Sequence, residues 1–329
     1  MKLLVDDRWF GATGIGRYAK EILQRAPSGN EIECLSKTWA IKNPLSPLLL
    51  GFEINRKSPD LFWSPGFMPP MNSKVPYIVS VHDLIHLKYG SKLQIIYYNM
   101  IIRPLLKKAE FVLTGSEYSK REILSWAGLS PEKVVVNYYA ASPGFTSAGE
   151  KFSPGYRYLL YVGNKRYHKN LARLIIAFSR ADVTNDLKLV FTGDVTKELL
   201  SLADKLNISD RLVFLGFVAE ADLPSIYRGA MAVILVSLYE GFGIPIVESM
   251  ACGTAVIASN VSAMPEVAGG AGLLVDPENI DEICSGIEQV VNSDALREKL
   301  ILNGKKRSHE FSWEASAKNI WDVFASVKR

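Results

Sequence analysis

The sequence has little cysteine and no long hydrophobic run, and both absences narrow the class of protein. Its three cysteines, Cys34, Cys252 and Cys284, are widely spaced and odd in number, which is typical of reduced thiols in a cytosolic protein. No run approaches the ~20 apolar residues of a membrane span. The start, MKLLVDDRWF, has too short an apolar run before Asp6 and Asp7 for a signal peptide. We therefore expect a cytoplasmic protein that does not cross a bilayer, and a peripheral contact with the inner face of a membrane stays open.

The sequence also contains two stretches that resemble cofactor-binding motifs without matching them. After the first expected strand, residues 2–5, Gly11, Gly14 and Gly16 give G-x-x-G-x-G, the reverse of the G-x-G-x-x-G fingerprint, so NAD binding is disfavoured. For any one of these glycines, a plain tight turn is as good an interpretation as a loop that lines a binding site. The stretch HDLIH at 82–86 imitates the zinc motif H-E-x-x-H, but its first histidine ends a strand and its acid is an aspartate. We therefore expect no cofactor and no metal site.

The composition describes an ordinary globular protein. The 329 residues suggest about two domains, and 22% are charged while 48% are hydrophobic. A net charge of +4 is too mild to indicate a nucleic-acid partner, although it suits an anionic donor or a membrane surface.

Residues 237–258, SLYEGFGIPIVESMACGTAVIA, carry the strongest functional signal. An apolar run leads into a glycine-rich turn at residues 240–243, and Pro245 follows at a position that suits the start of a helix. The free N–H groups of such a helix start would attract an anion such as phosphate. Glu240 and Glu248 flank the start of the helix, and carboxylates there suit neutral donors such as sugar hydroxyls. The alternative is an ordinary turn with solvated glutamates.

The whole chain alternates apolar strands with helical stretches, which predicts parallel sheets covered by helices. The strands expected in the first half lie at 2–5, near 31–35, 59–63 and 75–81, and at 111–114 and 133–137. Those expected in the second half read YLLYV, LKLVFTG, RLVFLG, MAVILV and AVIAS. Between the halves, residues 140–157 are rich in Gly, Pro and Ser, as an interdomain linker would be. We therefore expect two α/β domains, residues 1–150 and 151–310.

Two groups of side chains follow expected strand ends, where open α/β sheets bind ligands. His82 and Asp83 follow the strand at 75–81, whereas His86 is expected to be a bystander. In the second half, residues 163–170 read GNKRYHKN, and their three cations suit a diphosphate. A solvated basic loop is the alternative.

Residues 93–109 admit two interpretations. They are rich in apolar and aromatic side chains, with Arg103, Lys107 and Lys108 at one end. They could form a membrane-surface helix. The pattern favours a core helix whose terminal cations suit its dipole, with Pro104 interrupting it.

These motifs resemble those of the retaining glycosyltransferases of family 4. Residues 240–248, EGFGIPIVE, are similar to that family's E-x7-E signature, and the similarity continues through MACGTAVIAS and PEVAGGAGLLVDP. The resemblance implies the GT-B architecture, in which two Rossmann-like domains face each other across a deep cleft. It also implies that the last helix, residues 311–329, crosses back to pack on the first domain, which holds the acceptor side.

The resemblance implies a nucleotide diphospho-sugar donor in the second domain. Glu248 would hydrogen-bond the ribose hydroxyls, and Glu240 the hydroxyls of the transferred sugar. The amides of Phe242 and Gly243 would help to hold the sugar and phosphate, while Lys169 would neutralise the leaving diphosphate. The further donor-binding residues implied are Gly163, Asn164, Arg166, Gly216, Gly241 and Ile244.

The basic loop departs from the family pattern. Family members commonly show G-R-x5-K, and Lys169 matches the lysine while Asn164 replaces the arginine, so Lys165 or Arg166 would supply the second charge. His82 would contact the sugar's primary hydroxyl side or the acceptor, which makes His82, Glu240 and Lys169 the expected catalytic residues. The residues expected to line the acceptor side are Gly14, Gly16, Arg17 and Asp83.

The implied activity is hexosyl transfer with retention of the anomeric configuration. TGIGRYAKEI, VHDL and the loop with Asn164 are most similar to bacterial mannosyltransferases of surface-polysaccharide assembly, which implies GDP-mannose and a glycan or lipid-linked saccharide acceptor. UDP-hexoses and dTDP-rhamnose remain alternatives. So do a sugar-nucleotide epimerase of the same fold and a non-catalytic nucleotide-sugar-binding protein. No Asp-x-Asp pair occurs, so we expect turnover without metal.

Overall fold

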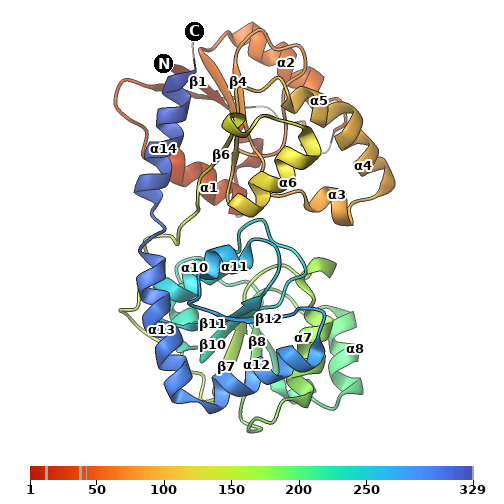
Figure 1. Cartoon of the computed structure of the whole chain (residues 1–329), viewed down its shortest axis with the longest axis vertical. Helices are drawn as coiled ribbons and strands as arrows, with labels where there is room; N and C mark the ends of the chain where they lie inside the picture. The colour runs from red at the N-terminus through yellow and green to blue at the C-terminus, as the bar shows by residue number, and fades with distance from the viewer. Residues whose placement is uncertain (12–13, 37–38, 42, 328–329) are drawn as a thin grey trace. The chain divides into compact units, whose positions relative to one another are not determined.

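The computed structural model describes residues 1–11, 14–36, 39–41 and 43–327. It divides the chain into two compact units (Figure 1). Unit 1 comprises Met1–Tyr139 with Ser312–Arg329, and unit 2 comprises Ala140–Phe311. Residues 140–150 belong to unit 2, whereas we expected them in the first domain, because Phe145 is buried in that unit's core. Each unit is a six-stranded parallel sheet with helices against it, as the alternating pattern predicted.

The sheet of unit 1 has the order β2-β1-β3-β4-β5-β6, and every neighbouring pair is parallel. Its strands are β1 (Lys2–Val5), β2 (Glu31–Cys34), β3 (Leu61–Ser64), β4 (Tyr77–Ser80), β5 (Phe111–Thr114) and β6 (Val134–Val136). All six expected strands are therefore confirmed. The strand order reverses direction between β1 and β3, so the loops that follow these two strands meet at the carboxyl edge of the sheet.

The helices of unit 1 pack on both faces of its sheet. They are α1 (Gly14–Leu23), α2 (Ser46–Lys57), α3 (Ile85–Tyr89), α4 (Lys92–Tyr97), α5 (Arg103–Leu106), α6 (Glu117–Ala127) and α14 (Trp313–Ser326), with a π-helical turn, η2 (Tyr98–Ile102), between α4 and α5. Side chains alternate between the faces of a strand. On β3, Phe62 accordingly joins the core that contains residues of α2, whereas Trp63 packs on Phe324 of α14 with ring centroids 5.3 Å apart.

Three helices of unit 1 differ from expectation. After the glycine-rich loop the sequence predicts a helix from about Arg17 to Arg25, whereas α1 begins at Gly14. Ala12 and Thr13 of that loop lie outside the described residues. α2 was not expected. The interruption expected at Pro104 takes the form of the π-helical turn, because Pro104 has no N–H to donate to the carbonyl four residues earlier.

The last helix, α14, is tied to unit 1 at several points. The indole N–H of Trp321 donates to the carbonyl of Ile22 at 3.0 Å, and the hydroxyl of Ser316 donates to the carbonyl of Tyr138 at 2.6 Å. These bonds pack α14 beside α1 (Figure 1). Lys328 and Arg329, which end the expected helix, lie outside the described residues.

The sheet of unit 2 has the order β12-β11-β10-β7-β8-β9 and is also parallel throughout its named strands. Its strands are β7 (Tyr158–Tyr161), β8 (Lys188–Phe191), β9 (Leu212–Phe214), β10 (Ala232–Leu235), β11 (Ala255–Ser259) and β12 (Leu273–Val275). Five of the six were expected, and β12 was not. The order reverses between β7 and β10, so the loops after these two strands meet at the carboxyl edge.

The helices of unit 2 follow the same alternation. They are α7 (Leu171–Arg180), α8 (Lys197–Lys205), α9 (Leu223–Gly229), α10 (Ile244–Ala251), α11 (Met264–Ala268), α12 (Ile280–Asn292) and α13 (Asp294–Ser308). α10 is the helix expected after the glycine-rich turn. Among the described residues, no helix of either unit is long and apolar enough to cross a membrane.

Candidate functional site

The reversal point of unit 2 joins the basic loop to the glycine-rich turn. The ammonium group of Lys169, after β7, donates to Oε1 of Glu240, after β10, at 2.6 Å. Both side chains are largely buried, 12% and 14% exposed. The carbonyl of His168 accepts from the N–H of Leu238 at 2.7 Å, which fixes the two loops side by side. The structure therefore brings together two of the three expected catalytic residues.

Glu240 is held at three points. Its Oε1 also accepts from the hydroxyl of Ser237 at 2.6 Å, and its backbone N–H donates to the hydroxyl of Ser262 at 3.1 Å. Ser237 ends the apolar run before the turn, and we did not select it from the sequence. Its position directly after a buried strand was the sequence feature that could have identified it as a site residue. Two donors on one oxygen hold this carboxylate in one orientation.

The helix start after Glu240 has the geometry that the sequence indicated. Gly243, the N-cap of α10, has a φ of +96°, a left-handed conformation that glycine adopts without strain. Pro245 lies in the first turn, and Ile244 is half-buried. Gly241 and Phe242 are buried, and the ring of Phe242 packs edge-on against Phe311 at 5.7 Å. The turn thus places its side chains inward and the N-terminus of α10 at the sheet edge that carries Glu240.

Glu248 lies deeper than we expected. It is 3% exposed on α10, and its Oε2 accepts a 2.5 Å hydrogen bond from the hydroxyl of Tyr227 on α9. A carboxylate in that position is part of the packing between two helices. Its contact with a ribose remains a prediction, and the sequence had given no signal that Tyr227 would be its partner.

The basic loop presents its cations in three different environments. Arg166 is exposed, its backbone N–H donates to Oδ1 of Asn164, and its carbonyl accepts from the N–H of Lys169 at 2.9 Å. The ammonium group of Lys165 donates to the carbonyl of Thr192 at 3.0 Å, and burial lowers its pKa below the usual value. Lys169 is paired with Glu240. Arg166 is therefore the cation of this loop that solvent reaches most freely.

Asn164 is exposed beside these cations, and its carbonyl accepts from the hydroxyl of Tyr161 at 2.5 Å. The preceding Gly163 donates its N–H to the hydroxyl of Thr192 at 3.4 Å. At the same edge, Gly216 accepts from the N–H of Gly193 at 2.7 Å, which joins the ends of β9 and β8. All expected donor-side residues except Glu248 therefore lie on loops or a helix start at the carboxyl edge of the unit 2 sheet.

His82 has both ring nitrogens engaged inside unit 1. Nε2 lies 2.7 Å from the carbonyl of Pro65, so it carries the proton, and Nδ1 accepts from the hydroxyl of Tyr139 at 2.6 Å. Burial lowers the pKa of His82, against smaller opposing effects of the Pro65 carbonyl and of Asp83. The ring of Tyr18 packs edge-on at 5.1 Å. His82 thus acts in this structure as a neutral link between loops of unit 1, and its expected sugar contact remains a prediction.

The other expected acceptor-side residues have structural roles at the same edge. Oδ1 of Asp83 accepts from the N–H of Ile85 at 2.9 Å, at the start of α3. Gly16 is buried where a Cβ would lie 2.3 Å from the carbonyl oxygen of Gly11. Gly14 is exposed and Arg17 half-buried, both on α1.

The reversal point of unit 1 holds residues that the sequence analysis did not select. After β1, Arg8 makes a two-pronged ion pair with Asp6, at 2.7 Å to each carboxylate oxygen, and both side chains are almost fully buried. Trp9 lies against the loop after β3, where a Cβ on Gly66 would meet its ring at 2.3 Å. Charged and aromatic residues directly after the first strand were the signal that could have found them.

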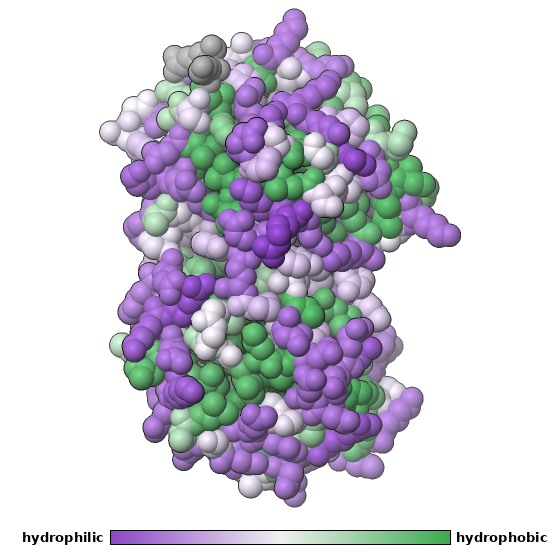
Figure 2. All heavy atoms as spheres, viewed as in Figure 1, coloured by the Kyte–Doolittle hydropathy of each residue, from purple (hydrophilic) through white to green (hydrophobic). Residues whose placement is uncertain are grey.

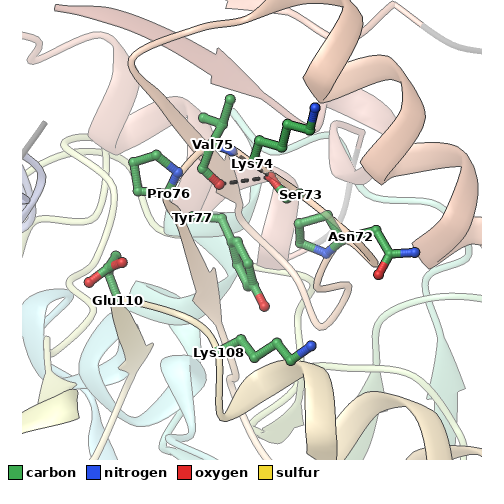
Figure 3. A pocket seen from close by; sticks show the side chains of 9 residues that line it. Asn72, Ser73, Lys74, Val75, Pro76, Tyr77, Lys108 and Glu110 are labelled. Atoms are coloured by element: carbon green, nitrogen blue, oxygen red, sulfur yellow. Dashed lines mark hydrogen bonds between the residues drawn. The ribbon is translucent and has the colours of Figure 1, made fainter.

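A cavity of about 320 Å³ in unit 1 lies at the opposite end of the sheet, beside the start of β4 (Figure 3). Its lining includes Lys74, Tyr77, Lys108 and Glu110. Figure 3 shows Lys74 and Lys108 on opposite sides of Tyr77, whose hydroxyl donates to the carbonyl of Leu105. The two cations do not converge, so this cavity is not an anion site. Across the described ranges, no group of three or more His, Cys, Asp or Glu is arranged to hold a metal ion.

Comparisons with known proteins identify relatives of both the sequence and the fold. Residues 145–307 match the family model "Glycosyl transferases group 1". "O-antigen chain mannosyltransferase B" of Escherichia coli is 30% identical over 241 residues, which cover 69% of this chain and 63% of the relative. "O-antigen chain mannosyltransferase RfbU" of Salmonella typhimurium is 29% identical over 215 residues, covering 64% of this chain and 60% of the relative. The matched parts thus span less than two thirds of these relatives' lengths.

Solved structures establish the fold over nearly the whole chain. The Anabaena protein Alr3699/HepE in complex with UDP and glucose superposes with a TM-score of 0.79 at 19% identity, covering 99% of this chain and all of that one. WaaG, a glycosyltransferase involved in lipopolysaccharide biosynthesis, gives a TM-score of 0.79 at 13% identity, with 99% and 100% coverage. The chain therefore has the α/β fold of GT-B-type glycosyltransferases.

Proposed function

We propose that the protein is a retaining glycosyltransferase that moves a hexose from a nucleotide diphospho-sugar to a glycan or lipid-linked saccharide. The match to a glycosyltransferase family model covers residues 145–307, nearly all of unit 2. The donor site is the carboxyl edge of the unit 2 sheet. The observation that carries the proposal is the Lys169–Glu240 pair at the reversal point of this sheet, beside the N-terminus of α10.

The Lys169–Glu240 pair suits two parts of the donor: the ammonium group suits the diphosphate, and the carboxylate suits the sugar hydroxyls. Negative charge grows on the diphosphate as the glycosidic bond breaks, and a lysine ammonium in a largely buried position stabilises it strongly. Glu240 orients that ammonium and presents its second oxygen to the hydroxyls of the transferred sugar. Arg166 and Lys165 lie in the same loop as Lys169 and add positive charge near the phosphates.

A front-face mechanism fits these residues. Glu240 already accepts from Lys169 and Ser237, so its carboxylate serves as a positioning group. In this mechanism the acceptor hydroxyl approaches on the side that the diphosphate leaves, and the leaving phosphate takes its proton. Configuration at the anomeric carbon is thereby retained without a protein nucleophile.

Mannose is the proposed sugar and GDP-mannose the proposed donor, since the two relatives above are named mannosyltransferases of O-antigen chains. The acceptor is proposed to be a growing surface polysaccharide or its lipid-linked precursor. A lipid-linked acceptor lies at a membrane, so a peripheral contact at the inner face is part of the proposal.

A donor panel tests the proposal. The full chain is incubated with GDP-mannose, UDP-glucose, UDP-galactose and dTDP-rhamnose, and released nucleoside diphosphate is measured with and without mixed lipid-linked oligosaccharides. Release from GDP-mannose alone, with an α-linked product by NMR, is the expected result. An epimerised donor without release would identify an epimerase, and binding without turnover a non-catalytic protein. Turnover is expected to persist in EDTA, and restoration by magnesium or manganese after its loss would contradict this.

A further inference from the structure

One buried polar side chain at the carboxyl edge of the unit 2 sheet is not among the site residues described above. Asn170 follows Lys169 directly and is only 5% exposed. Figure 2 shows hydrophilic residues over much of the visible face of unit 2, which is the ordinary place for an amide side chain. Burying an amide costs free energy unless its donors and its acceptor are paired. The partners of Asn170 therefore indicate what this side chain does.

Asn170 occupies the N-cap position of α7, yet its side chain does not cap that helix. An asparagine at an N-cap usually accepts, with its side-chain oxygen, a hydrogen bond from an N–H of the first helical turn. Among the described residues, the Asn170 side chain accepts no such bond. Its Oδ1 accepts instead from the guanidinium group of Arg173 at 3.0 Å. The amide group is thus committed to partners other than the backbone of its own helix.

Both hydrogens of this amide are donated to carbonyl groups on other loops. Nδ2 of Asn170 donates to the carbonyl of Val236 at 2.9 Å and to the carbonyl of Pro277 at 2.7 Å. Val236 follows β10 and Pro277 lies just after β12, whereas Asn170 ends the loop after β7. One side chain therefore cross-links three loops at the carboxyl edge of the sheet.

The two residues that flank Lys169 are both bonded to the loop after β10. The carbonyl of His168 accepts from the N–H of Leu238 at 2.7 Å. On the other side of Lys169, the amide of Asn170 donates to Val236, two residues earlier in that loop. Because both neighbours are held, the backbone of Lys169 cannot shift along the loop after β10 without breaking one of these bonds.

The backbone conformation of Asn170 limits which residue can form this cross-link. Its φ of +61° lies in the left-handed region, which glycine, asparagine and aspartate tolerate better than most residues. Glycine has no side chain, and an aspartate carboxylate would face two carbonyl oxygens without a hydrogen to donate. Of these three residue types, asparagine alone supplies two N–H donors.

We propose that Asn170 is a positioning residue for sugar transfer, which fixes the ammonium group of Lys169 against Glu240 and the leaving diphosphate. This inference rests on the proposed function, because Asn170 acts through Lys169. A cation displaced by about 1 Å still attracts the bound diphosphate, but it loses the geometry that stabilises the charge growing as the glycosidic bond breaks. Loss of the amide should therefore lower kcat more than it raises KM.

Two variants remove the amide and keep a residue that tolerates the left-handed backbone. Asn170→Gly deletes the side chain, and Asn170→Asp replaces both donors by acceptors. Steady-state kinetics uses the donor of the panel above that the wild type turns over fastest, and kcat is expressed per folded protein from circular dichroism. We expect kcat to fall about tenfold or more in each variant, while KM changes by no more than about threefold. If Asn170→Asp does not fold, Asn170→Gly alone decides the test.

A cycle with Lys169→Ala separates positioning from a general loss of structure. If Asn170 acts through Lys169, Asn170→Gly should lower kcat little further in the Lys169→Ala background, whereas a merely structural effect would be equal in both backgrounds. Asn207→Gly is the matched control. Asn207 also has a left-handed backbone, with a φ of +55°, but it is exposed just after α8, so its replacement should leave kcat unchanged.

The outcomes distinguish this inference from the proposed function. A kcat for Asn170→Gly equal to that of the wild type would overturn the inference and leave the proposed function standing. Equal losses of kcat in the two backgrounds would do the same, and so would a raised KM with an unchanged kcat. A wild type that turns over no donor of the panel would overturn the proposed function and this inference with it.

Discussion

The two units use the same sheet architecture to build opposite kinds of edge. In each, the strand order reverses once and the loops after two central strands meet. In unit 1 these loops and their neighbours satisfy one another: Arg8 neutralises Asp6, and His82 joins Pro65 to Tyr139. In unit 2 one pair, Lys169–Glu240, is accompanied by exposed polar residues and a helix start.

This difference indicates that the edges of the two units have different roles. An edge whose polar groups are paired internally is rigid and offers few groups to a ligand, whereas unit 2 keeps cations and hydrogen-bonding groups where solvent reaches them. We therefore expect unit 2 to supply most of the donor affinity and catalysis. Substitutions at the unit 1 edge should act chiefly on stability.

The largest expected effect comes from breaking the charge pair of each unit. Lys169→Ala should lower kcat about 100-fold or more, because in the proposed mechanism this cation stabilises the leaving diphosphate. Steady-state kinetics with GDP-mannose measures this. The matched substitution in unit 1, Arg8→Ala, leaves Asp6 buried without its partner and should cost about 3–5 kcal/mol of unfolding free energy.

These two variants separate catalysis from stability. Lys169→Ala leaves Glu240 with Ser237 as a donor, so it should lower the urea midpoint less than Arg8→Ala does, and the folded fraction of Arg8→Ala should keep its kcat. A kcat near wild type for Lys169→Ala would show that Lys169 does not stabilise the leaving group and that the phosphate site lies elsewhere. Together with Glu240→Ala, a Lys169→Ala/Glu240→Ala double variant completes a cycle that measures how strongly the pair is coupled.

The sequence predicted the elements of both sheets well because strand runs and turns are local signals. Eleven of the twelve strands and the helix start at Gly243 followed from apolar runs, glycine and proline. The pairing of polar side chains was not predictable in the same way. The bonds from Tyr227 to Glu248 and from Tyr139 to His82 join residues far apart in sequence, and their geometry depends on packing between helices and loops.

Residues 93–109 illustrate the same limit. Their composition favoured a core helix, and the structure buries Ile102, Leu105 and Leu106 as that interpretation requires. The exposed Leu93 and Met100 are equally apolar, so composition alone could not separate the two faces. The π-helical turn at Tyr98–Ile102 changes the number of residues per turn. A regular 3.6-residue period therefore does not predict which of these side chains are buried.

A substitution at Glu248 tests whether a second carboxylate of unit 2 contributes to donor binding. If this carboxylate also binds the ribose, Glu248→Ala should weaken nucleotide binding by roughly 1.5–3 kcal/mol, measured by calorimetry with GDP. It should also lower stability, because the hydroxyl of Tyr227 then lacks its acceptor. Tyr227→Phe is the control, since it removes the donor and leaves the carboxylate. Unchanged GDP affinity in folded Glu248→Ala would restrict Glu248 to a packing role.

In unit 1, His82 should make stability depend on pH. Its folded-state pKa is lowered by burial, so between that value and the unfolded pKa of about 6.5 the unfolded state binds more protons. This contribution is complete above pH ~6.5 and is lost as pH falls, by at most about 1.4 kcal/mol per pH unit. Urea unfolding at several pH values should show this slope, and His82→Gln should flatten it. Equal slopes in the two proteins would contradict the assignment, and His309→Gln, at an exposed site, serves as the control.

The smallest expected effect concerns the second cation of the basic loop in unit 2. Arg166 is exposed, so Arg166→Ala should lower kcat only severalfold, as solvent screens an exposed charge. Asn164 occupies the position that the G-R-x5-K pattern assigns to an arginine, and its exposed side chain leaves room for a longer one. Asn164→Arg in the Arg166→Ala background should therefore restore part of the lost kcat, whereas Asn164→Gln, which adds length without charge, should not. Rescue by both substitutions would attribute the effect to loop packing. Rescue by neither would place the second phosphate cation at the half-buried Lys165, which then becomes the next residue to replace.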